Sequence, residues 1–362
     1  MRVGIIGLPG SGKTTLFNAL TGASAPTGDF GSGGTHRAVA QVPDARLDFL
    51  GEAHPGKKVI HATVEYVDEP ALGEEAGRRR PTVDELPEAL KVADALLLVV
   101  RAFEDPRVPH PRGRVDPLKD CEDAQLDLIL RDLAVIEKRR ERISTSSGKA
   151  KREEDAQELE LLKRLSEELE AERPLRACAL KEEEVKLLRG FGFLSAKPLL
   201  IAVNTGEEEL RAAGGKLGGE WEALSGKPLT SSLSLCAKLE MELSELEPEE
   251  RREFLEDFDL KELALTRVLR DSYRLLGLIS FFTIGKEEVR AWSIPEGTRA
   301  LKAAGQVHSD MERGFIKAEV VAFDDFRSLG SMAAVREKGL LRLEGKDYPV
   351  RDGDIIQFRF HV

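Results

Sequence analysis

The sequence predicts an α/β fold with a mostly parallel sheet, interrupted by an antiparallel helical pair and followed by a small α+β domain. Three observations support this prediction. Short apolar runs alternate with helical patterns, a charged stretch with regularly spaced leucines occupies about residues 120–173, and short strand-like segments take over after residue 278. With 362 residues, the chain is long enough for two or three domains.

The composition limits the classes of function. A formal net charge of −11 argues against non-specific nucleic-acid binding by the whole surface, although a local basic patch is compatible with it. Cys121, Cys178 and Cys236 lie far apart, so we expect neither a disulfide framework nor a zinc site. The chain shows no signal peptide and no apolar run long enough to cross a bilayer, and we expect a cytoplasmic protein.

The strongest motif begins at Gly7 and fits G-x-x-x-x-G-K-[ST] between a predicted strand, residues 2–6, and a predicted helix, residues 15–20. Its glycines allow backbone N–H groups to surround a phosphate at the positive end of a helix. The Lys13 side chain can reach the β- and γ-phosphates, and the Thr14 hydroxyl can bind Mg²⁺. We therefore expect a nucleoside triphosphate to be bound by Pro9, Gly10, Ser11, Gly12, Lys13, Thr14 and Thr15.

A stretch rich in glycine, serine and proline, residues 21–34, follows this helix and predicts a loop. In a P-loop switch protein, such a loop orders itself on the γ-phosphate and Mg²⁺ through a threonine hydroxyl. Thr35 is the candidate. An equally weighted alternative is that Thr35 only begins the strand predicted at residues 38–42.

A second candidate for the metal site is Asp68, which ends the alternating strand predicted at residues 62–68. A carboxylate at the end of a strand beside the phosphate-binding loop is suited to hold Mg²⁺. The alternative is a solvated carboxylate. Before this strand, residues 43–50 predict a helix capped by Asp44, and after it Arg78-Arg79-Arg80 predicts a solvated loop or a contact with nucleic-acid phosphate.

The next apolar run, residues 93–101, predicts a central parallel strand. Between residues 120 and 173, apolar residues recur every three or four positions on both sides of a Ser- and Thr-rich break. This pattern predicts an antiparallel helical pair. Its mixed charges favour a solvent-exposed pair with internal ion pairs, with a dedicated binding surface as the alternative.

Two further strands are predicted at residues 198–204 and 228–238. Because loops after parallel strands face the ligand, we expect Asn204 and the run Cys236-Ala237-Lys238 to lie near the nucleotide base. After residue 278, Phe281, Phe282 and Trp292 are expected in the core of the small domain rather than as stacking platforms.

Over nearly its whole length, the chain resembles the YchF/Obg-like ATPase family, in the translation-factor class of P-loop proteins. The resemblance rests on the motif around Gly7, on Asn204-x-x-Glu207, and on later runs that include Val289-Arg290-Ala291-Trp292, Gly314-Phe315-Ile316 and Asp352-Gly353-Asp354. It implies a nucleotide-binding domain in two parts, 1–119 and 191–277, split by a coiled-coil arm, 120–190, and followed by a TGS domain with a β-grasp fold, 278–362. It also implies nucleotide hydrolysis coupled to association with the ribosome or RNA through the arm and the TGS domain.

The resemblance also allows a prediction of which nucleotide base the chain recognises. Most relatives in this class recognise guanine with Asn-Lys-x-Asp, whose Asp accepts from the guanine N1–H and 2-amino group. Here the run is Asn204-Thr205-Gly206-Glu207, so the guanine-specific Asp is absent. We expect the base to contact Asn204, Thr205, Glu207 and residues 236–238, and ATP to be preferred, while GTP or GDP binding can persist.

One motif departs from the family pattern. After Asp68 the family has Ile-Ala-Gly-Leu, whereas this chain has Glu69-Pro70-Ala71-Leu72. The glycine that normally meets the γ-phosphate has become Ala71, and Leu72 stands where many relatives elsewhere in the class have a water-orienting Gln. We therefore expect slow hydrolysis, with the diphosphate product able to remain bound.

Two functions from different classes follow. The first is a slow ATPase or GTPase switch in which Lys13, Thr35 and Asp68 are catalytic and Thr14, Thr35 and Asp68 hold Mg²⁺. The alternative is a hydrolysis-impaired nucleotide-binding adaptor for RNA or the ribosome, motivated by Ala71 and by the Arg78-Arg79-Arg80 region that replaces the family's glycine-rich switch. A metabolic kinase is less consistent with the motifs. We expect no membrane association and a monomer.

Overall fold

The computed structural model of the chain describes residues 1–25, 35–69, 88–145 and 152–361, and of residues 152–154 and 248 only the backbone. It contains two compact units. The first unit comprises Met1–Ala40 and Glu65–Asp271, and the second comprises Gln41–Val64 and Ser272–Val362.

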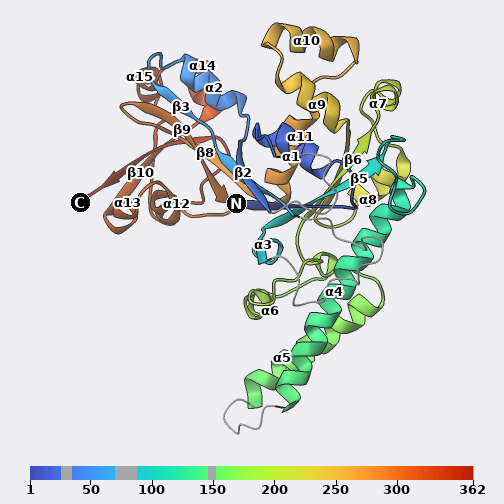
Figure 1. Cartoon of the computed structure of the whole chain (residues 1–362). Helices are drawn as coiled ribbons and strands as arrows, with labels where there is room; N and C mark the ends of the chain where they lie inside the picture. Colours follow the sequence, from blue (N-terminus) through green and yellow to red (C-terminus); the bar gives the residue numbers. More distant parts are fainter. Residues whose placement is uncertain (26–34, 70–87, 146–151, 362) are drawn as a thin grey trace. The chain divides into compact units, whose positions relative to one another are not determined.

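The first unit is organised around a six-stranded sheet in the order β2-β4-β1-β5-β6-β7 (Figure 1). The pairings from β4 through β7 are all parallel, which places the carboxyl ends of these strands at one edge. β5 and β6 are buried along almost their whole length, as expected for central parallel strands. The strands are β1 (Arg2–Ile6), β2 (His36–Gln41), β4 (Thr63–Asp68), β5 (Ala95–Ala102), β6 (Leu199–Thr205) and β7 (Thr230–Leu235).

Two long helices, α4 and α5, lie side by side and extend away from this sheet (Figure 1). Their contact buries Ile136, Leu162 and Leu165, which belong to the regularly spaced apolar positions of both segments. The helices of the unit are α1 (Lys13–Thr21), α3 (Glu88–Lys91), α4 (Pro117–Thr145), α5 (Arg152–Glu170), η2 (Leu175–Ala177), α6 (Glu182–Leu188), α7 (Glu207–Ala213), α8 (Gly219–Ser225), α9 (Ala237–Ser244), α10 (Pro248–Asp257) and α11 (Ala264–Leu275).

A buried carboxylate fixes α4 to the segment that leads into β6. The two oxygens of Asp132 accept hydrogen bonds from the backbone N–H groups of Leu194, at 2.8 Å, and Ser195, at 2.7 Å. Arg176 adds a second connection, donating to the Ser195 carbonyl and to the Thr230 hydroxyl at the start of β7, each at 3.3 Å. The helical pair is therefore attached to the sheet by buried polar contacts as well as by apolar packing.

The second unit contains a six-stranded mixed sheet in the order β11-β10-β12-β8-β9-β3. Phe281 and Phe282 are fully buried, as predicted, while Trp292 is partly buried against the same core and donates to the Thr283 hydroxyl at 2.9 Å. The elements are α2 (Ala45–Glu52), β3 (Lys58–Ile60), β8 (Leu278–Ile284), β9 (Glu288–Pro295), α12 (Ala300–Val307), α13 (Ser309–Arg313), β10 (Phe315–Ala322), α14 (Phe323–Leu329), α15 (Met332–Glu337), β11 (Arg342–Glu344) and β12 (Asp354–Phe360).

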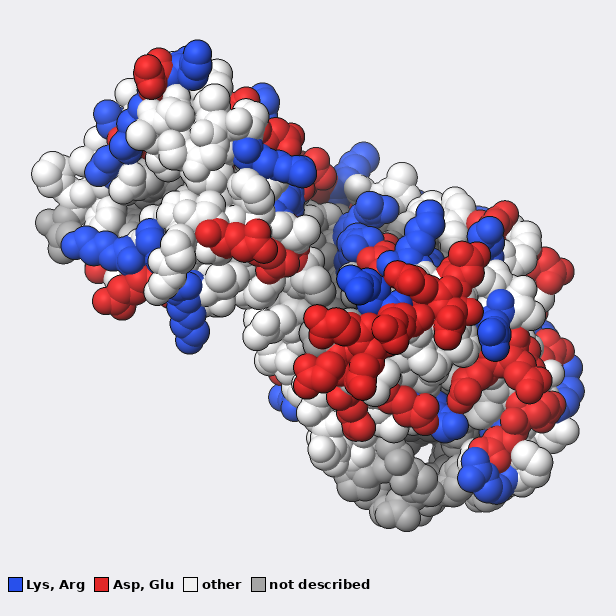
Figure 2. Space-filling model, turned by 90° about the horizontal axis from the view of Figure 1, so that it is seen from above, with Lys and Arg blue, Asp and Glu red and all other residues white. Residues whose placement is uncertain are grey.

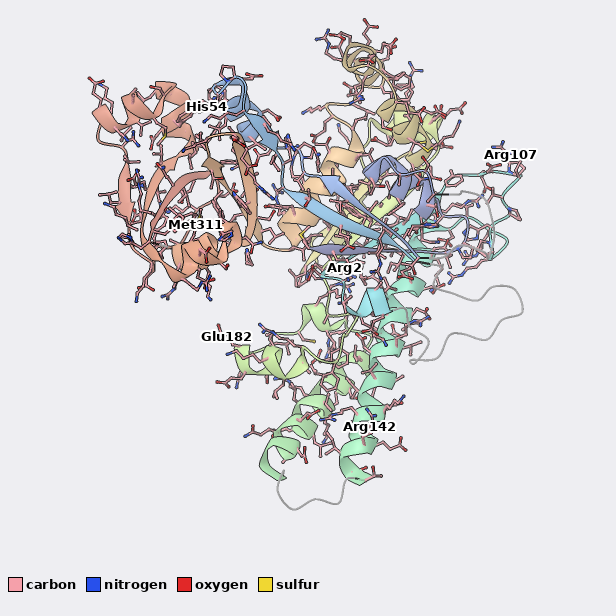
Figure 3. All side chains as sticks on the ribbon, turned by 60° about the vertical axis from the view of Figure 1, so that its left-hand side comes forward. Arg2, His54, Arg107, Arg142, Glu182 and Met311 are labelled. Atoms are coloured by element: carbon pink, nitrogen blue, oxygen red, sulfur yellow. The ribbon has the colours of Figure 1, made fainter. Side chains whose placement is uncertain are left out.

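Residues 41–64 belong to this second unit, which the sequence analysis did not anticipate. β3 pairs in parallel with β9, and Asp44 caps α2 by accepting from the backbone N–H of Arg46. The Arg46 guanidinium binds the carboxylates of Asp44, at 2.8 Å, and Asp352, at 2.7 Å. His54, labelled in Figure 3, stacks on Phe326 with ring centroids 5.8 Å apart. Both strand pairing and side-chain contacts thus join this early segment to the C-terminal strands.

Charge is unevenly distributed over the surface. In Figure 2, acidic side chains form a broad patch on one of the two bodies, while basic side chains stand in smaller groups. Within the described residues, no helix is long and apolar enough to cross a membrane. Cys121, Cys178 and Cys236 form no disulfide in the structure. The face shown in Figure 2 is therefore poorly suited to attract a polyanion through its acidic patch.

We expect the stability difference between the wild-type chain and Asp132→Asn to depend on pH. Burial raises the pKa of the Asp132 carboxyl from 3.8 to about 6, although the N–H groups of Leu194 and Ser195 oppose this shift. Between these values the folded state binds more protons than the unfolded state, so the wild type should lose stability relative to the variant as pH rises, by about 2–3 kcal/mol. Urea unfolding followed by circular dichroism from pH 4 to 7 measures the difference.

Glu137→Gln, an exposed substitution on the same helix, is the matched control and should show no such trend. A difference between wild type and Asp132→Asn that stays constant with pH would contradict the prediction.

Candidate nucleotide-binding site

The glycine-rich loop lies between β1 and α1, at the carboxyl edge of the sheet. Gly7 and Gly12 both have positive φ, 150° and 93°. A Cβ at Gly7 would lie 2.4 Å from the Val99 carbonyl oxygen, and one at Gly12 would lie 2.3 Å from the amide nitrogen of Asn204. Both positions therefore require glycine for close approach as well as for conformation. Pro9 and Gly10 form the turn between them, and Thr15 lies in the first turn of α1.

Lys13, the first residue of α1, turns its side chain back over the loop. Its ammonium donates to the carbonyl oxygens of Gly7, at 3.1 Å, and Leu8, at 3.0 Å. Burial lowers the pKa of Lys13 to about 8, while the nearby negative charge of Asp68 opposes the shift. The loop thus holds a partly desolvated cation at the place where the motif requires one.

Thr14 and Asp68 are in direct contact. The Thr14 hydroxyl donates to Asp68 Oδ2 at 2.7 Å, and Asp68 Oδ1 is buried without a partner in the described part of the chain. Burial raises the pKa of Asp68, against the opposing effects of the Thr14 hydrogen bond and the charges of Lys13 and His36. The structure therefore brings together two of the three predicted metal-binding residues.

Thr35 makes a different contact. Its hydroxyl donates to Glu69 Oε2 at 3.0 Å, and Glu69 is only 3% exposed. Burial raises the pKa of Glu69, while this hydrogen bond and the charge of Arg37 lower it. The sequence analysis treated Glu69 only as part of an altered motif, so its participation in the site is new.

Asn204, at the end of β6, connects three segments. Its amide nitrogen donates to the Ser11 carbonyl and its amide oxygen accepts from the backbone N–H of Ala237, each at 2.9 Å. The residues expected near the base thus lie beside the phosphate-binding loop, because parallel strands end at the same edge.

The other predicted base-binding residues lie around the same two strand ends. Lys238 and Glu207 form an exposed ion pair at 3.2 Å. The Thr205 hydroxyl donates to the Leu235 carbonyl at 3.2 Å. Cys236 is buried, and burial raises the pKa of its thiol, so it contributes shape rather than a nucleophile.

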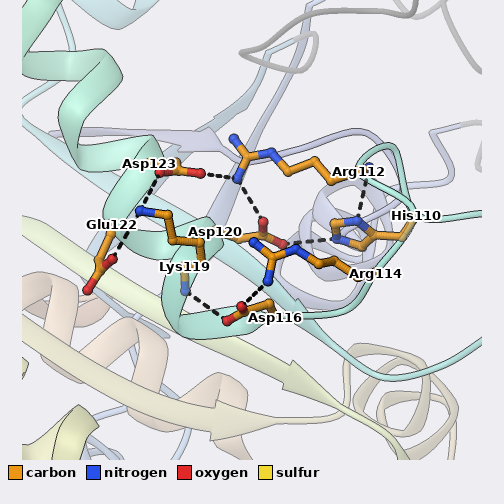
Figure 4. Close-up of polar contacts among 8 residues, drawn as sticks. All are labelled: His110, Arg112, Arg114, Asp116, Lys119, Asp120, Glu122 and Asp123. Carbon is orange, nitrogen blue, oxygen red and sulfur yellow. Dashed lines mark hydrogen bonds and ion pairs between the residues drawn. The ribbon is translucent and has the colours of Figure 1, made fainter.

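A polar cluster that the sequence analysis missed fixes the loop between β5 and α4 (Figure 4). His110 Nε2 lies 2.9 Å from Asp120 Oδ2, and both side chains are almost fully buried. Arg112 donates to the other oxygen of Asp120, also at 2.9 Å. The only sequence signal for this cluster is that a histidine, an arginine and an aspartate occur within eleven positions. Such spacing does not predict that the three side chains are in contact.

Some predicted residues cannot be placed. Ala71, Leu72 and the run Arg78-Arg79-Arg80 lie outside the described residues, as does most of the glycine-rich loop before Thr35. Their expected effects on hydrolysis and nucleic-acid contact therefore remain predictions.

The geometry fits a nucleoside phosphate together with a divalent cation. Gly12, the residue before α1, provides no side-chain cap, so the N–H groups of the first turn of α1 face a potential anion site. Ser11 Oγ and Asp68 Oδ1 are buried without partners among the described residues, and hydroxyl and carboxylate oxygens are ligands that Mg²⁺ prefers. The fold and this loop define a P-loop protein of the GTPase type.

Comparisons with known proteins identify the family. The model described as 50S ribosome-binding GTPase matches residues 2–139, and the YchF-GTPase C-terminal model, described as a protein of unknown function, matches residues 278–361. The chain is 39% identical to "Ribosome-binding ATPase YchF" of Bacillus subtilis, with 100% of both chains covered. It is 36% identical to the protein of that name from Escherichia coli O157:H7, covering 100% of this chain and 99% of the relative.

The solved structure of the Schizosaccharomyces pombe YchF GTPase is similar over 99% of this chain and 97% of that chain, with a TM-score of 0.84 and 27% identity. The chain therefore belongs to the YchF family.

We expect Asn204→Ala to weaken nucleotide binding by about 30-fold, because it removes two hydrogen bonds worth about 1 kcal/mol each that hold the loop and the start of α9. Asn204→Asp is the matched variant, since it keeps an acceptor for the Ala237 N–H but cannot donate to the Ser11 carbonyl. Titration with a fluorescent nucleoside diphosphate measures both affinities. Wild-type affinity in both variants would show that this bridge does not organise the site.

Proposed function

We propose that this chain is a nucleotide-dependent switch that binds ATP with Mg²⁺, hydrolyses it slowly, and associates with the ribosome. The observation that carries the proposal is the assembled loop, in which Lys13 is held by the Gly7 and Leu8 carbonyls and Thr14 contacts Asp68. Membership of a family whose curated members are named ribosome-binding ATPases supports the activity and the partner.

Each residue has a distinct role in this proposal. The Lys13 ammonium neutralises charge on the β- and γ-phosphates, and the N–H groups of the loop and the first turn of α1 surround them. Thr14 and Asp68 hold Mg²⁺, and Thr35 senses the γ-phosphate. When bound, Mg²⁺ supplies positive charge that stabilises the transferring phosphoryl group. Loss of the expected glycine at Ala71 makes hydrolysis slow, and the diphosphate product remains bound between cycles.

The preference for ATP rests on Glu207. This residue occupies the place of the guanine-reading Asp, and its carboxylate forms an ion pair with Lys238. A carboxylate on a longer side chain that already has a cationic partner is a poor acceptor for the guanine N1–H and 2-amino group. Thr205 and residues 236–238 complete the surroundings of the base, where GTP binds more weakly.

The expected outcome of a competition titration is that ATP displaces a fluorescent nucleotide at least as well as GTP. In the variant Glu207→Asp, the shorter acid restores the guanine acceptor and should shift the ratio of affinities toward GTP by about tenfold, the value of roughly one charge-assisted hydrogen bond. At least tenfold tighter binding of GTP than of ATP by the wild type would refute the preference.

The ribosome or its RNA is proposed to contact the helical pair α4–α5 and the C-terminal unit. The second unit supports its proposed identity as a TGS domain with a β-grasp fold, because α12 packs on a mixed sheet in which β12 lies between β8 and β10. The acidic patch makes RNA binding by that part of the face shown in Figure 2 less favourable. A ribosome partner implies action in the cytoplasm, and we propose a monomer.

The alternative, a hydrolysis-impaired adaptor that keeps its nucleotide as a structural ligand, is motivated by Ala71 and by the Arg78-Arg79-Arg80 region that replaces the family's glycine-rich switch. It predicts that ribosome binding does not depend on turnover, whereas the switch predicts that it follows the state of the nucleotide.

Lys13→Ala should reduce ATP turnover to background, a loss of at least about 100-fold. The substitution removes the ammonium group that is positioned to neutralise charge on the transferring phosphoryl group. The same variant should lose the dependence of ribosome co-sedimentation on ATP and on a non-hydrolysable analogue. Lys57→Ala, which removes an exposed lysine in the second unit bound to the Gly285 carbonyl, is the control. Unchanged turnover in Lys13→Ala would reject the switch, and wild-type turnover no higher than background would favour the adaptor.

A further inference from the structure

We propose that Glu69 is a further ligand of the divalent cation, directly or through a bound water, so that Asp68 and Glu69 form a two-carboxylate cation site. This inference deepens the proposed function and rests on it only in placing the cation at this edge of the sheet. The family pattern implied by the resemblance has Ile at this position, and Glu69 adds a second carboxylate there.

The two carboxylates are consecutive, and both are buried. Asp68 ends β4 and is 4% exposed, and Glu69 follows it at 3%. Each accepts a hydrogen bond from one hydroxyl on one oxygen, from Thr14 at 2.7 Å and from Thr35 at 3.0 Å. The other oxygen of each, Asp68 Oδ1 and Glu69 Oε1, is buried and has no partner within the described residues.

This arrangement is unfavourable without a cation. Burying a carboxylate costs several kcal/mol unless an opposite charge or hydrogen bonds compensate. The charges of Lys13 and His36 act on Asp68, and the charge of Arg37 acts on Glu69. The Lys13 ammonium, however, donates to carbonyl oxygens of the loop, and no cationic side chain among the described residues forms an ion pair with either carboxylate. A divalent cation would add positive charge directly at the two unpartnered oxygens.

The chemistry of the four side chains matches a hard cation. Mg²⁺ and Mn²⁺ prefer carboxylate, hydroxyl and water oxygens, and they usually retain several waters. The hydroxyls of Thr14 and Thr35 donate their protons to Asp68 and Glu69, respectively, which leaves the lone pairs of each hydroxyl oxygen available to a cation. Two carboxylates in place of one should also allow the cation to bind before the nucleotide does.

Mn²⁺ binding to the full chain, followed by electron paramagnetic resonance, tests the inference. We expect the wild type to bind one Mn²⁺ ion both without nucleotide and with ADP, and Glu69→Gln to bind it about 10–100-fold more weakly, the usual effect of losing a group that supports a metal. Gln keeps the size of the side chain and an oxygen that accepts from Thr35, so the variant removes mainly the charge.

Glu65→Gln is the matched control, because Glu65 lies on the same strand but pairs with Arg2 at 2.8 Å. It should bind Mn²⁺ as the wild type does. Nucleotide affinity in EDTA, measured for all three proteins, shows that Glu69→Gln is folded and tests the phosphate-binding loop independently of the cation.

Equal Mn²⁺ affinity of the wild type and Glu69→Gln in both states would overturn the inference, as would absence of Mn²⁺ binding by the wild type in both. Absence of nucleotide binding by the wild type in the presence of Mg²⁺ would instead count against the proposed function. If Glu69→Gln does not fold, Glu69→Ile, which restores the residue of the family pattern, replaces it and must show the same loss of Mn²⁺ affinity.

Discussion

The close approach of the phosphate-binding loop to the neighbouring strand ends is the constraint on which the site depends. Gly12 leaves no room for a side chain beside the amide of Asn204, and that amide bonds to the Ser11 carbonyl and to the N–H of Ala237. One side chain therefore fixes the loop that surrounds the phosphates and the segment expected to surround the base. Because β1, β5, β6 and β7 are parallel and adjacent, their carboxyl ends lie next to one another, and this places the phosphate-binding loop beside the segments that follow β6 and β7.

The helical pair is attached to the sheet at both ends of its strands, at the carboxyl ends that carry the candidate site and at the opposite, amino ends. Near its start, α4 holds the loop that follows β5 through Asp120 and His110, and further along Asp132 holds the segment that enters β6. From Asp120 to Asp132 the helix rises about 18 Å, comparable to the length of a strand. Buried polar contacts therefore tie α4 both to the loop at the carboxyl ends of the strands and to the segment that enters β6.

The sequence patterns that identified the fold are local, and they succeeded where structure is determined locally. The strand before Gly7, the helix after it and the Asp44 cap depend on a few consecutive residues. The pairing of β3 with β9 joins residues far apart in the sequence, and its three-residue strand carries no periodic signal. The Thr35–Glu69 contact was missed for a related reason, because Glu69 lies beyond the end of β4, where alternation no longer sets the direction of a side chain.

The path of the chain gives residues 41–64 a particular consequence. The chain leaves the first unit after Ala40, at the end of β2, and returns at Glu65 within β4. Thr35 precedes the first crossing and Asp68 follows the second, so the two residues proposed to sense the γ-phosphate and the metal flank the excursion. The excursion is itself held in the second unit by the β3–β9 pairing and by Arg46, whose guanidinium binds carboxylates from both ends of the sequence. These contacts hold both ends of residues 41–64 in the second unit. Thr35 and Asp68 each lie only a few residues along the chain from this segment, so the backbone itself connects both residues of the site to the second unit.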